Sequence, residues 1–274
     1  MKNFTVCGAL KELNVSYLGG CTTSAKVMKS LKNGCLTYII YLAPADLSGH
    51  NVCPNHTWCK ELCLNGSGHN KGDILAHGKN SLINIARIKK TNAFYNNRET
   101  FMQLMIHEIK RYKKVAENSN LHFAVRINGT SDLSPELFKF PTVENGKNIL
   151  EIFPEIQFYD YTKVASKLRL SLPNKYNNYD LTLSYNGHNW NECEKYLKQG
   201  GKIAVVFEND LPYLFKGYKV NNANEYDMRF EDKGGEICGL HYHRVAANYK
   251  DGIYIGLGND SFVVKETDEN CIWH

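Results

Sequence analysis

The chain has 274 residues, of which 43% are hydrophobic and 22% are charged, so it can bury a substantial core. Its net charge of +5 is too small to establish nucleic-acid binding by itself. No apolar stretch of about 18 residues occurs, and the first residues lack the apolar core of a signal peptide, so we expect a cytoplasmic protein without a membrane span.

The first part of the chain combines an unassigned segment with one strand and two helices. Residues 1–34 show no clear periodicity and are treated as an N-terminal extension. The β-rich apolar run over residues 36–42 predicts a buried strand. Helices are predicted over about 73–91 and about 98–117, and the second has one apolar face. That face carries Phe101, Leu104, Met105, Ile109 and Tyr112.

From residue 121 onwards, predicted strands and helices alternate. The strands cover 121–127, 156–161, 179–184 and 202–207, and helices are expected after Ser134-Pro135, over 163–170 and over about 190–199. Such alternation is typical of βαβ units with a parallel sheet. We therefore expect one α/β domain over residues 1–274, a partial or complete parallel (βα)n barrel. A β-rich C-terminal part follows over about 212–274.

Three of the nine cysteines lie in the loop after the first predicted strand, with the spacing C-x5-C-x3-C: Cys53, Cys59 and Cys63. In a cytoplasmic protein, such a cluster more often binds metal or takes part in catalysis than forms disulfides. Three thiolates are one ligand fewer than a closed structural zinc site needs. The fourth position is therefore open to a substrate, to a cofactor, or to His50, His56, His69 or another cysteine.

Polar residues follow each predicted strand, where the ligands of parallel α/β sheets gather. The candidate cofactor-binding residues are Arg126, Asn128, Thr130, Ser131, Asp132 and Ser184, and the candidate catalytic residues are Asp160, Lys163 and Glu208. Helix capping explains Ser131 and Asp132 equally well, but a buried Arg126 requires an acidic partner or a ligand. Asp160 and Lys163 could instead form a simple loop ion pair.

Several segments resemble a phage and plasmid family known as the gene product eighty-eight family. They are Cys53-Pro54 with Cys59 and Cys63, residues 126–132, residues 153–163, residues 202–207 and residues 227–230. The resemblance covers roughly residues 36–250. It implies a phage or mobile-element origin, with the host cytoplasm as the place of action, but it implies no particular reaction.

A strand, a three-cysteine loop and a helix that open a (βα)n series also resemble the radical S-adenosylmethionine superfamily. The superfamily's usual spacing is C-x3-C-x2-C, and its glycine-rich sequence after the second strand is replaced here by residues 128–132. The resemblance implies a [4Fe–4S] cluster on Cys53, Cys59 and Cys63, with S-adenosylmethionine on the open iron and an electron donor as partner. Asn128, Ser131, Asp132 and Asp160 would then position the cofactor and an unknown small-molecule or nucleotide substrate.

The alternative is a non-enzymatic module held together by zinc or by a closed cluster. In that interpretation, the basic residues 110–114 at the end of the second helix contact nucleic acid or a host protein. Basic charge at a helix C-terminus is also typical of a solvent-facing surface. The sequence contains no phosphate-binding loop, no G-x-S-x-G segment and no H-E-x-x-H pair, which disfavours kinases and common hydrolases.

Overall fold

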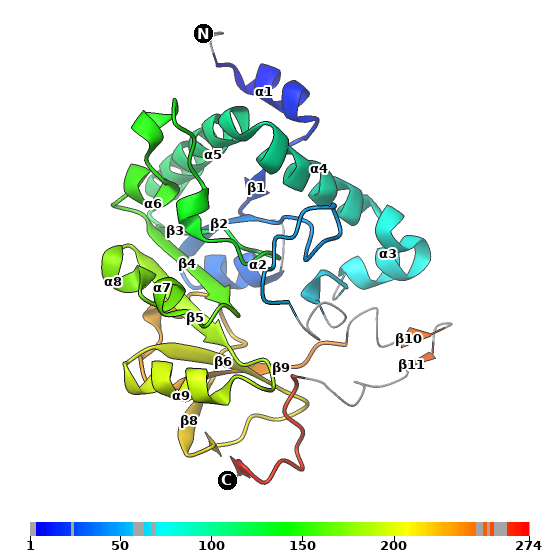
Figure 1. Ribbon diagram of the computed structural model, residues 1–274, viewed down its shortest axis with the longest axis vertical. Helices are drawn as coiled ribbons and strands as arrows, with labels where there is room; N and C mark the ends of the chain where they lie inside the picture. The colour runs from blue at the N-terminus through cyan, green and yellow to red at the C-terminus, as the bar shows by residue number, and fades with distance from the viewer. Residues whose placement is uncertain are drawn as a thin grey trace. The chain divides into compact units, whose positions relative to one another are not determined.

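The computed structural model describes residues 4–22, 25–56, 63–66, 69–244, 249–250, 253–254 and 262–273 (Figure 1). The chain divides into two compact units. The first consists of Met1–Pro54, Lys79–Asp160 and Pro173–Asp180, and the second of Asn55–Gly78, Tyr161–Leu172 and Leu181–His274. The single domain expected from the sequence stays a prediction.

Ten strands are hydrogen-bonded in the order β1-β2-β3-β4-β5-β6-β9-β8-β7-β12. Their bounds are β1 Gly19–Gly20, β2 Cys35–Ile40, β3 His122–Arg126, β4 Gln157–Thr162, β5 Tyr179–Ser184, β6 Lys202–Phe207, β7 Leu214–Phe215, β8 Tyr218–Asn222, β9 Ile237–His241 and β12 Cys271–Ile272. The pairs β2–β3, β3–β4, β5–β6, β6–β9 and β8–β9 are parallel, whereas β1–β2, β7–β8 and β7–β12 are antiparallel. A mixed α/β fold with a mostly parallel sheet is thus confirmed, and closure into a barrel stays a prediction.

In the first unit, helix α5 (Arg98–Asn118) packs against β2 and β3, and helix α1 (Val6–Leu13) packs against α4 (Leu82–Asn96) and α5 (Figure 1). Helix α2 (Ala25–Lys32) contacts β2, and α6 (Ile149–Ile152) precedes β4. The predicted apolar face of α5 is confirmed, because Phe101, Leu104, Met105 and Ile109 are fully buried while Tyr112 is half-buried.

The carboxylate of Glu108 on α5 is buried and joins β1 to β2. It accepts hydrogen bonds from the backbone N–H groups of Leu18 and Gly19, both 3.0 Å, and from the Tyr38 hydroxyl at 2.5 Å. Burial lowers the pKa of nearby Lys90 to about 8, an effect that the charge of Glu108 opposes. A buried carboxylate with three donors is strongly favoured over one left unpaired. Glu108 therefore fixes the N-terminal segment on the sheet.

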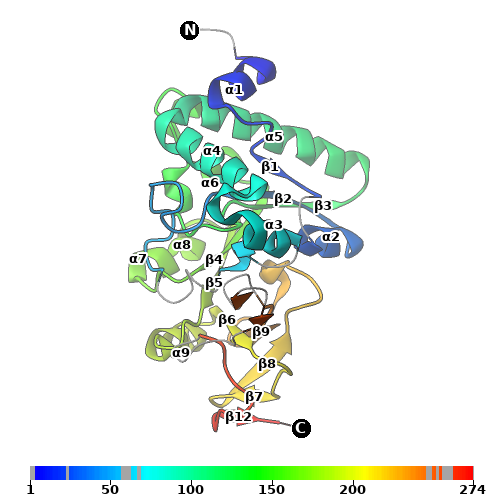
Figure 2. The ribbon, with the colours of Figure 1, turned by 90° about the vertical axis from the view of Figure 1, so that its right-hand side faces the viewer.

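The second unit contains α3 (His69–His77), α7 (Lys167–Leu170), α9 (Trp190–Lys198) and the short pair β10 (Tyr249–Lys250) and β11 (Ile253–Tyr254), while α8 (Leu172–Lys175) spans the division. Helix α9 packs against β6 (Figure 2). Their shared core includes Leu183, Cys193, Ile203, Val205 and Phe207. This helix ends where Gly200 adopts a φ of +81°, as the sequence predicts, because glycine enters the left-handed region without steric cost.

Four local expectations differ from the structure. The helix expected over 73–91 is divided into α3 and α4 by a 3-10 turn, Gly78–Asn80, where Gly78 has a φ of +56°. The Ser134-Pro135 start leads only to the 3-10 turn Pro135–Leu137, and the helix expected from residue 163 begins at Lys167. Within the C-terminal part that is expected to be β-rich, Arg229–Glu231 is a 3-10 helix. In each case local turn geometry outweighs the apolar periodicity.

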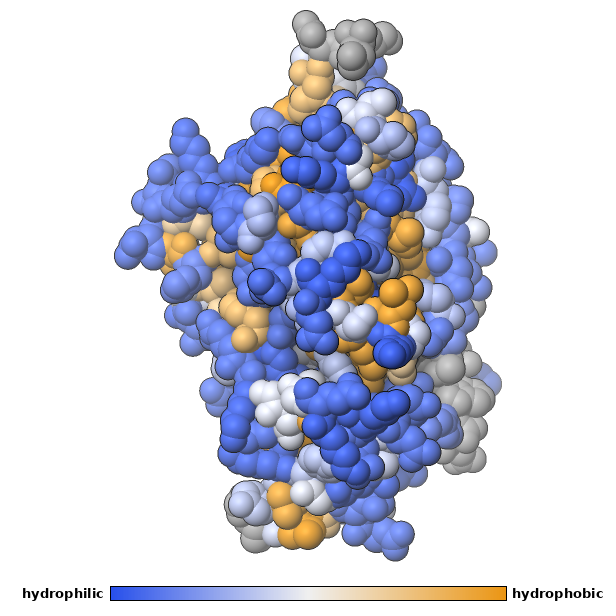
Figure 3. All heavy atoms as spheres, turned by 60° about the vertical axis from the view of Figure 1, so that its left-hand side comes forward, coloured by the Kyte–Doolittle hydropathy of each residue, from blue (hydrophilic) through white to orange (hydrophobic). Residues whose placement is uncertain are grey.

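The surface shown in Figure 3 is dominated by polar side chains. Large exposed apolar side chains such as Leu82 and Leu168 belong to separate helices. Within the described part of the chain, every helix is too short or too polar to cross a membrane.

We predict that Glu108→Gln lowers the free energy of unfolding by about 2–3 kcal/mol, because the amide loses a charged acceptor and cannot accept three hydrogen bonds equally well. The matched control is Glu117→Gln on the same helix, where the side chain is 58% exposed and pairs with Lys113. Urea denaturation measures both changes. Equal stability of the two variants would contradict the structural role of Glu108.

Candidate functional site

The side chain of Asn128 closes the turn after β3 through hydrogen bonds, and Asn128 is only 2% exposed. Its Oδ1 atom accepts hydrogen bonds from Leu133 N at 3.0 Å and from the Ser131 hydroxyl at 2.7 Å, and its Nδ2 donates to Leu133 O at 2.9 Å. Asparagine favours turns because its amide can replace backbone partners in this way. Two predicted site residues, Asn128 and Ser131, therefore contact each other directly.

Asp160 in β4 holds this turn from the neighbouring strand. Its carboxylate accepts from Asn128 N at 2.8 Å, from Asn128 Nδ2 at 3.0 Å and from the Tyr179 hydroxyl at 3.3 Å. Asp160 is 1% exposed, so these protein donors replace water. The geometry is that of a carboxylate that positions the turn. A catalytic role for Asp160 stays a prediction.

The same turn is hydrogen-bonded to the segment that follows β2. Gly129 N donates to Ile40 O at 2.9 Å, and the Thr130 hydroxyl donates to Leu42 O at 2.5 Å. Asp132 N donates to Val52 O at 2.8 Å. A Cβ atom on Gly129 would lie 2.6 Å from Ile40 O, so only glycine permits this close approach. The carboxyl ends of β2 and β3 are thereby joined.

Cys53 lies against this turn and is half-buried. Its Sγ atom accepts a hydrogen bond from Ala45 N at 3.4 Å and, as a thiol, donates to Thr130 O at 3.7 Å. The side chain of Asn51 accepts from Cys53 N at 2.9 Å. Ala45 has a φ of +50°, an uncommon conformation for alanine. The sulfur is therefore held by backbone contacts.

His50, one of the predicted fourth ligands, stacks on Tyr95 of α4 with 4.2 Å between ring centroids and 7° between planes. The Tyr95 hydroxyl donates to Asn51 O at 3.5 Å. Burial raises the pKa of Tyr95, and nearby Arg98 opposes this shift. Tyr95 thus fixes the loop just before Cys53.

The remainder of the cysteine motif is described only in part. Cys63 is half-buried, and its Sγ accepts from Asn65 N at 3.5 Å. Cys59 lies outside the described residues. His56 is half-buried, and His69 is the first residue of α3. Among the described residues, no three His, Cys, Asp or Glu side chains are close enough together to bind one metal ion, and the predicted three-cysteine ligand set stays a prediction.

The other predicted site residues divide between the two units. Arg126 ends β3 in the first unit and is 6% exposed. Lys163, Ser184 and Glu208 belong to the second unit. Each has a contact within that unit. Lys163 Nζ lies 5.5 Å from the ring centroid of Phe262, Ser184 O accepts from Asn189 Nδ2 at 3.1 Å, and Glu208 N donates to Val264 O at 2.9 Å.

The basic end of α5 is partly compensated by acidic side chains. Lys110 Nζ lies 3.6 Å from a carboxylate oxygen of Glu144, and Lys113 Nζ lies 2.5 Å from one of Glu117. Arg111 lies over the ring of Tyr112, 4.5 Å from its centroid. This pairing reduces the net positive field expected for a nucleic-acid surface.

Sequence reasoning missed Ala45, Tyr95 and Tyr179. Tyr179 opens a strand that the sequence does predict, but periodicity alone cannot show that its hydroxyl reaches Asp160. Tyr95 lies near the end of α4, 42 positions after Cys53, and no local spacing relates the two. The sequence around Tyr95 is the Ala-Phe-Tyr run at 93–95, and this run predicts only an ordinary apolar helix face.

A comparison with protein families matches residues 18–252 to the family described as Gene product 88. No curated protein matches the chain. No solved structure matches it either.

We predict that Gly129→Ala lowers the free energy of unfolding by about 1–3 kcal/mol, because the added methyl group overlaps the carbonyl of Ile40. Gly72→Ala is the matched control, since a Cβ atom there meets nothing within 4 Å and the residue lies in α3. Urea unfolding of both variants tests this, and a Gly129 variant as stable as the control would show that the turn can shift freely.

We also predict that Asp160→Asn costs about 2–3 kcal/mol, because one carboxylate acceptor becomes an amide donor that faces Asn128. Tyr179→Phe removes only one hydroxyl, and the double variant should show a coupling of at least about 0.5 kcal/mol. The control is Asp210→Asn in an exposed loop. Additive effects in the unfolding cycle would mean that Asp160 and Tyr179 act independently.

Proposed function

Because this chain belongs to the Gene product 88 family, we propose a function that rests on its own strand-end residues. The protein is an iron–sulfur enzyme of the radical S-adenosylmethionine type that acts on a small-molecule or nucleotide substrate. Cys53, Cys59 and Cys63 are the cluster ligands, and an electron donor is the required partner.

The observation that carries the proposal is the position of the Cys53 sulfur at the carboxyl ends of the parallel strands β2 and β3. Its contacts are the N–H group of Ala45 in the loop after β2 and the carbonyl of Thr130 in the turn after β3. Cofactors of open α/β sheets bind at this edge. A half-buried thiol fixed there is well placed to serve as a metal ligand.

The surroundings of the sulfurs also fit a cluster. Cys53 and Cys63 each accept a hydrogen bond from a backbone N–H group, at 3.4 Å and 3.5 Å. Such hydrogen bonds stabilise negative charge on sulfur and are among the features that set cluster potentials. When bound, the cluster with S-adenosylmethionine supplies one-electron chemistry that ends in hydrogen abstraction from a substrate.

In this proposal, the protein's own residues bind and orient the cofactor. The turn of Asn128, Thr130 and Ser131 holds the polar end of the cofactor through its backbone and hydroxyl groups. Asp160 keeps Asn128 in place, which makes Asp160 a positioning residue in this proposal. Asp132 is fixed at the same edge through its backbone hydrogen bond to Val52. Tyr95 and His50 fix the loop before Cys53.

The test is the metal and acid-labile sulfide content of the anaerobically purified full chain, with absorption spectra recorded with and without S-adenosylmethionine. We expect about four irons and four sulfides per chain and a spectrum that S-adenosylmethionine perturbs. Cys53→Ser should lose most of the iron. The matched control, Cys7→Ser, replaces an exposed cysteine of α1 and should retain it.

Three outcomes would contradict the proposal. One zinc per chain without sulfide would indicate the non-enzymatic zinc-stabilised module. An iron–sulfur cluster whose spectrum ignores S-adenosylmethionine would indicate a cluster with a different substrate or a structural role. Retention of iron in the Cys53 variant would exclude this cysteine as a ligand.

A further inference from the structure

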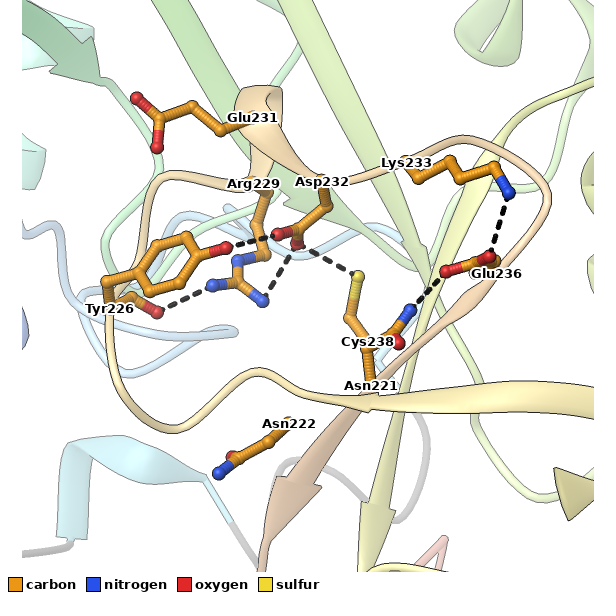
Figure 4. Close-up of a pocket in the computed structure, with 9 residues that line it drawn as sticks. All are labelled: Asn221, Asn222, Tyr226, Arg229, Glu231, Asp232, Lys233, Glu236 and Cys238. Carbon is orange, nitrogen blue, oxygen red and sulfur yellow. Dashed lines mark hydrogen bonds and ion pairs between the residues drawn. The ribbon is translucent and has the colours of Figure 1, made fainter. Parts of the chain in front are cut away.

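A polar cavity of about 300 Å³ lies in the second unit, lined by β8, the short helix Arg229–Glu231 and β9 (Figure 4). Its volume is at the lower end of the range for small-molecule sites. One wall is Arg229, from the segment 227–230 that resembles the family and that the proposed thiolate chemistry does not use. The cavity therefore needs an explanation of its own.

The guanidinium of Arg229 forms a fixed wall. The side chain is 1% exposed, its Nη1 lies 2.9 Å from Asp232 Oδ2, and its Nη2 donates to Tyr226 O at 2.6 Å. Lys202 Nζ donates to the carbonyl of Arg229 at 2.5 Å. Within the described part of the chain, Arg229 Nε is buried and has no hydrogen-bond partner. The guanidinium is therefore a fixed part of the cavity's structure, held by Asp232 and Tyr226.

Asp232 organises the floor beside it. Its Oδ1 accepts from the Tyr226 hydroxyl at 3.1 Å, and its Oδ2 accepts from Cys238 Sγ at 3.3 Å (Figure 4). Burial, with a smaller contribution from Asp232, raises the pKa of Cys238 to about 12. The sulfur stays protonated at neutral pH and acts as a hydrogen-bond donor. This part of the lining therefore offers hydrogen-bonding groups but no activated nucleophile.

The remaining walls carry paired polar groups. Glu236 accepts hydrogen bonds from the side-chain amide of Asn221 and from Lys233 Nζ, the latter at 3.2 Å. The hydrogen bond from Asn221 lowers the pKa of Glu236, so this carboxylate is ionised at neutral pH. Asn222 is exposed and lines the same cavity. The cavity lining thus carries both hydrogen-bond donors and hydrogen-bond acceptors.

The charges on the lining restrict the class of ligand. Carboxylates outnumber cations, with Glu231, Asp232 and Glu236 against Arg229 and Lys233. An anion such as phosphate meets net repulsion there, and an apolar ligand would leave the polar walls without water or partners. An amine would pair with the carboxylates but would use none of the hydrogen-bond donors on the lining.

We propose that this cavity binds a small neutral polyhydroxylated molecule, a single sugar ring or the ribose of a nucleoside. Each hydroxyl both donates and accepts, so neighbouring hydroxyls match walls on which carboxylates and amide oxygens accept while amide and ammonium N–H groups donate. The volume is large enough for one sugar ring. This site is independent of the thiolate site.

Saturation-transfer NMR on the full chain tests the proposal with four probes: methyl β-D-ribofuranoside, methyl α-D-glucopyranoside, adenosine and, as an amine, spermidine. We expect saturation of ring protons in at least one glycoside or in the ribose of adenosine, with millimolar affinity for a single ring. A glycoside signal identifies a free sugar site, and a signal from adenosine alone, on its ribose protons, identifies a nucleoside site.

Three variants locate the binding. Glu236→Gln keeps the side-chain shape but removes the charge, and Asn222→Trp fills the cavity from an exposed position. Both should weaken binding at least about tenfold. The control, Glu192→Gln on the exposed side of α9, should not change it. If Glu236→Gln does not fold, the affinity of Asn222→Trp for the probes decides the question.

Three results would overturn the proposal. They are no binding of any hydroxylated probe, binding of spermidine or of the adenine base alone, and hydroxylated-probe binding that Asn222→Trp leaves unchanged.

Discussion

The hydrogen bonds between Asn128 and the buried carboxylate of Asp160 are the interaction on which the candidate site depends. Asp160 accepts three protein donors in a position that water does not reach, so removing any partner leaves a polar group desolvated. The carboxylate fixes Asn128, and Asn128 in turn closes the turn from Ser131 to Leu133. Because this turn is also bonded to the segment after β2, the ends of three parallel strands share one rigid hydrogen-bond network.

That network determines where the first cysteine lies. Cys53 contacts Ala45 from its own loop and Thr130 from the turn, so its sulfur has a defined place before any metal binds. Tyr95 fixes the preceding residues by stacking and by one hydrogen bond. A preorganised ligand loses little conformational entropy on binding, which is the physical basis for placing a cofactor at this edge.

The second unit contains a buried positive charge, the guanidinium of Arg229. A fully buried arginine is unfavourable unless charged and polar partners replace its hydration, and Asp232 with Tyr226 O provides them for Arg229. The same residues line a cavity and leave one guanidinium donor unused within the described chain. We propose the edge that carries Cys53 for a metal cluster and the polar cavity of the second unit for a hydroxylated ligand.

The sequence by itself determined the mixed α/β fold, the parallel strands β2, β3, β4, β5 and β6, the apolar face of α5 and the family. Apolar runs, β-branched residues and glycine stops are local signals that act within a few positions. The sequence also indicated that residues 128, 131 and 160 share one edge of the sheet. Only the tertiary structure decided that Asp160 contacts Asn128 and Tyr179, that Tyr95 supports the cysteine loop, and that residues 229–231 form a 3-10 helix beside a cavity. These features depend on side-chain direction and on contacts between residues far apart in the chain, and no local pattern encodes either.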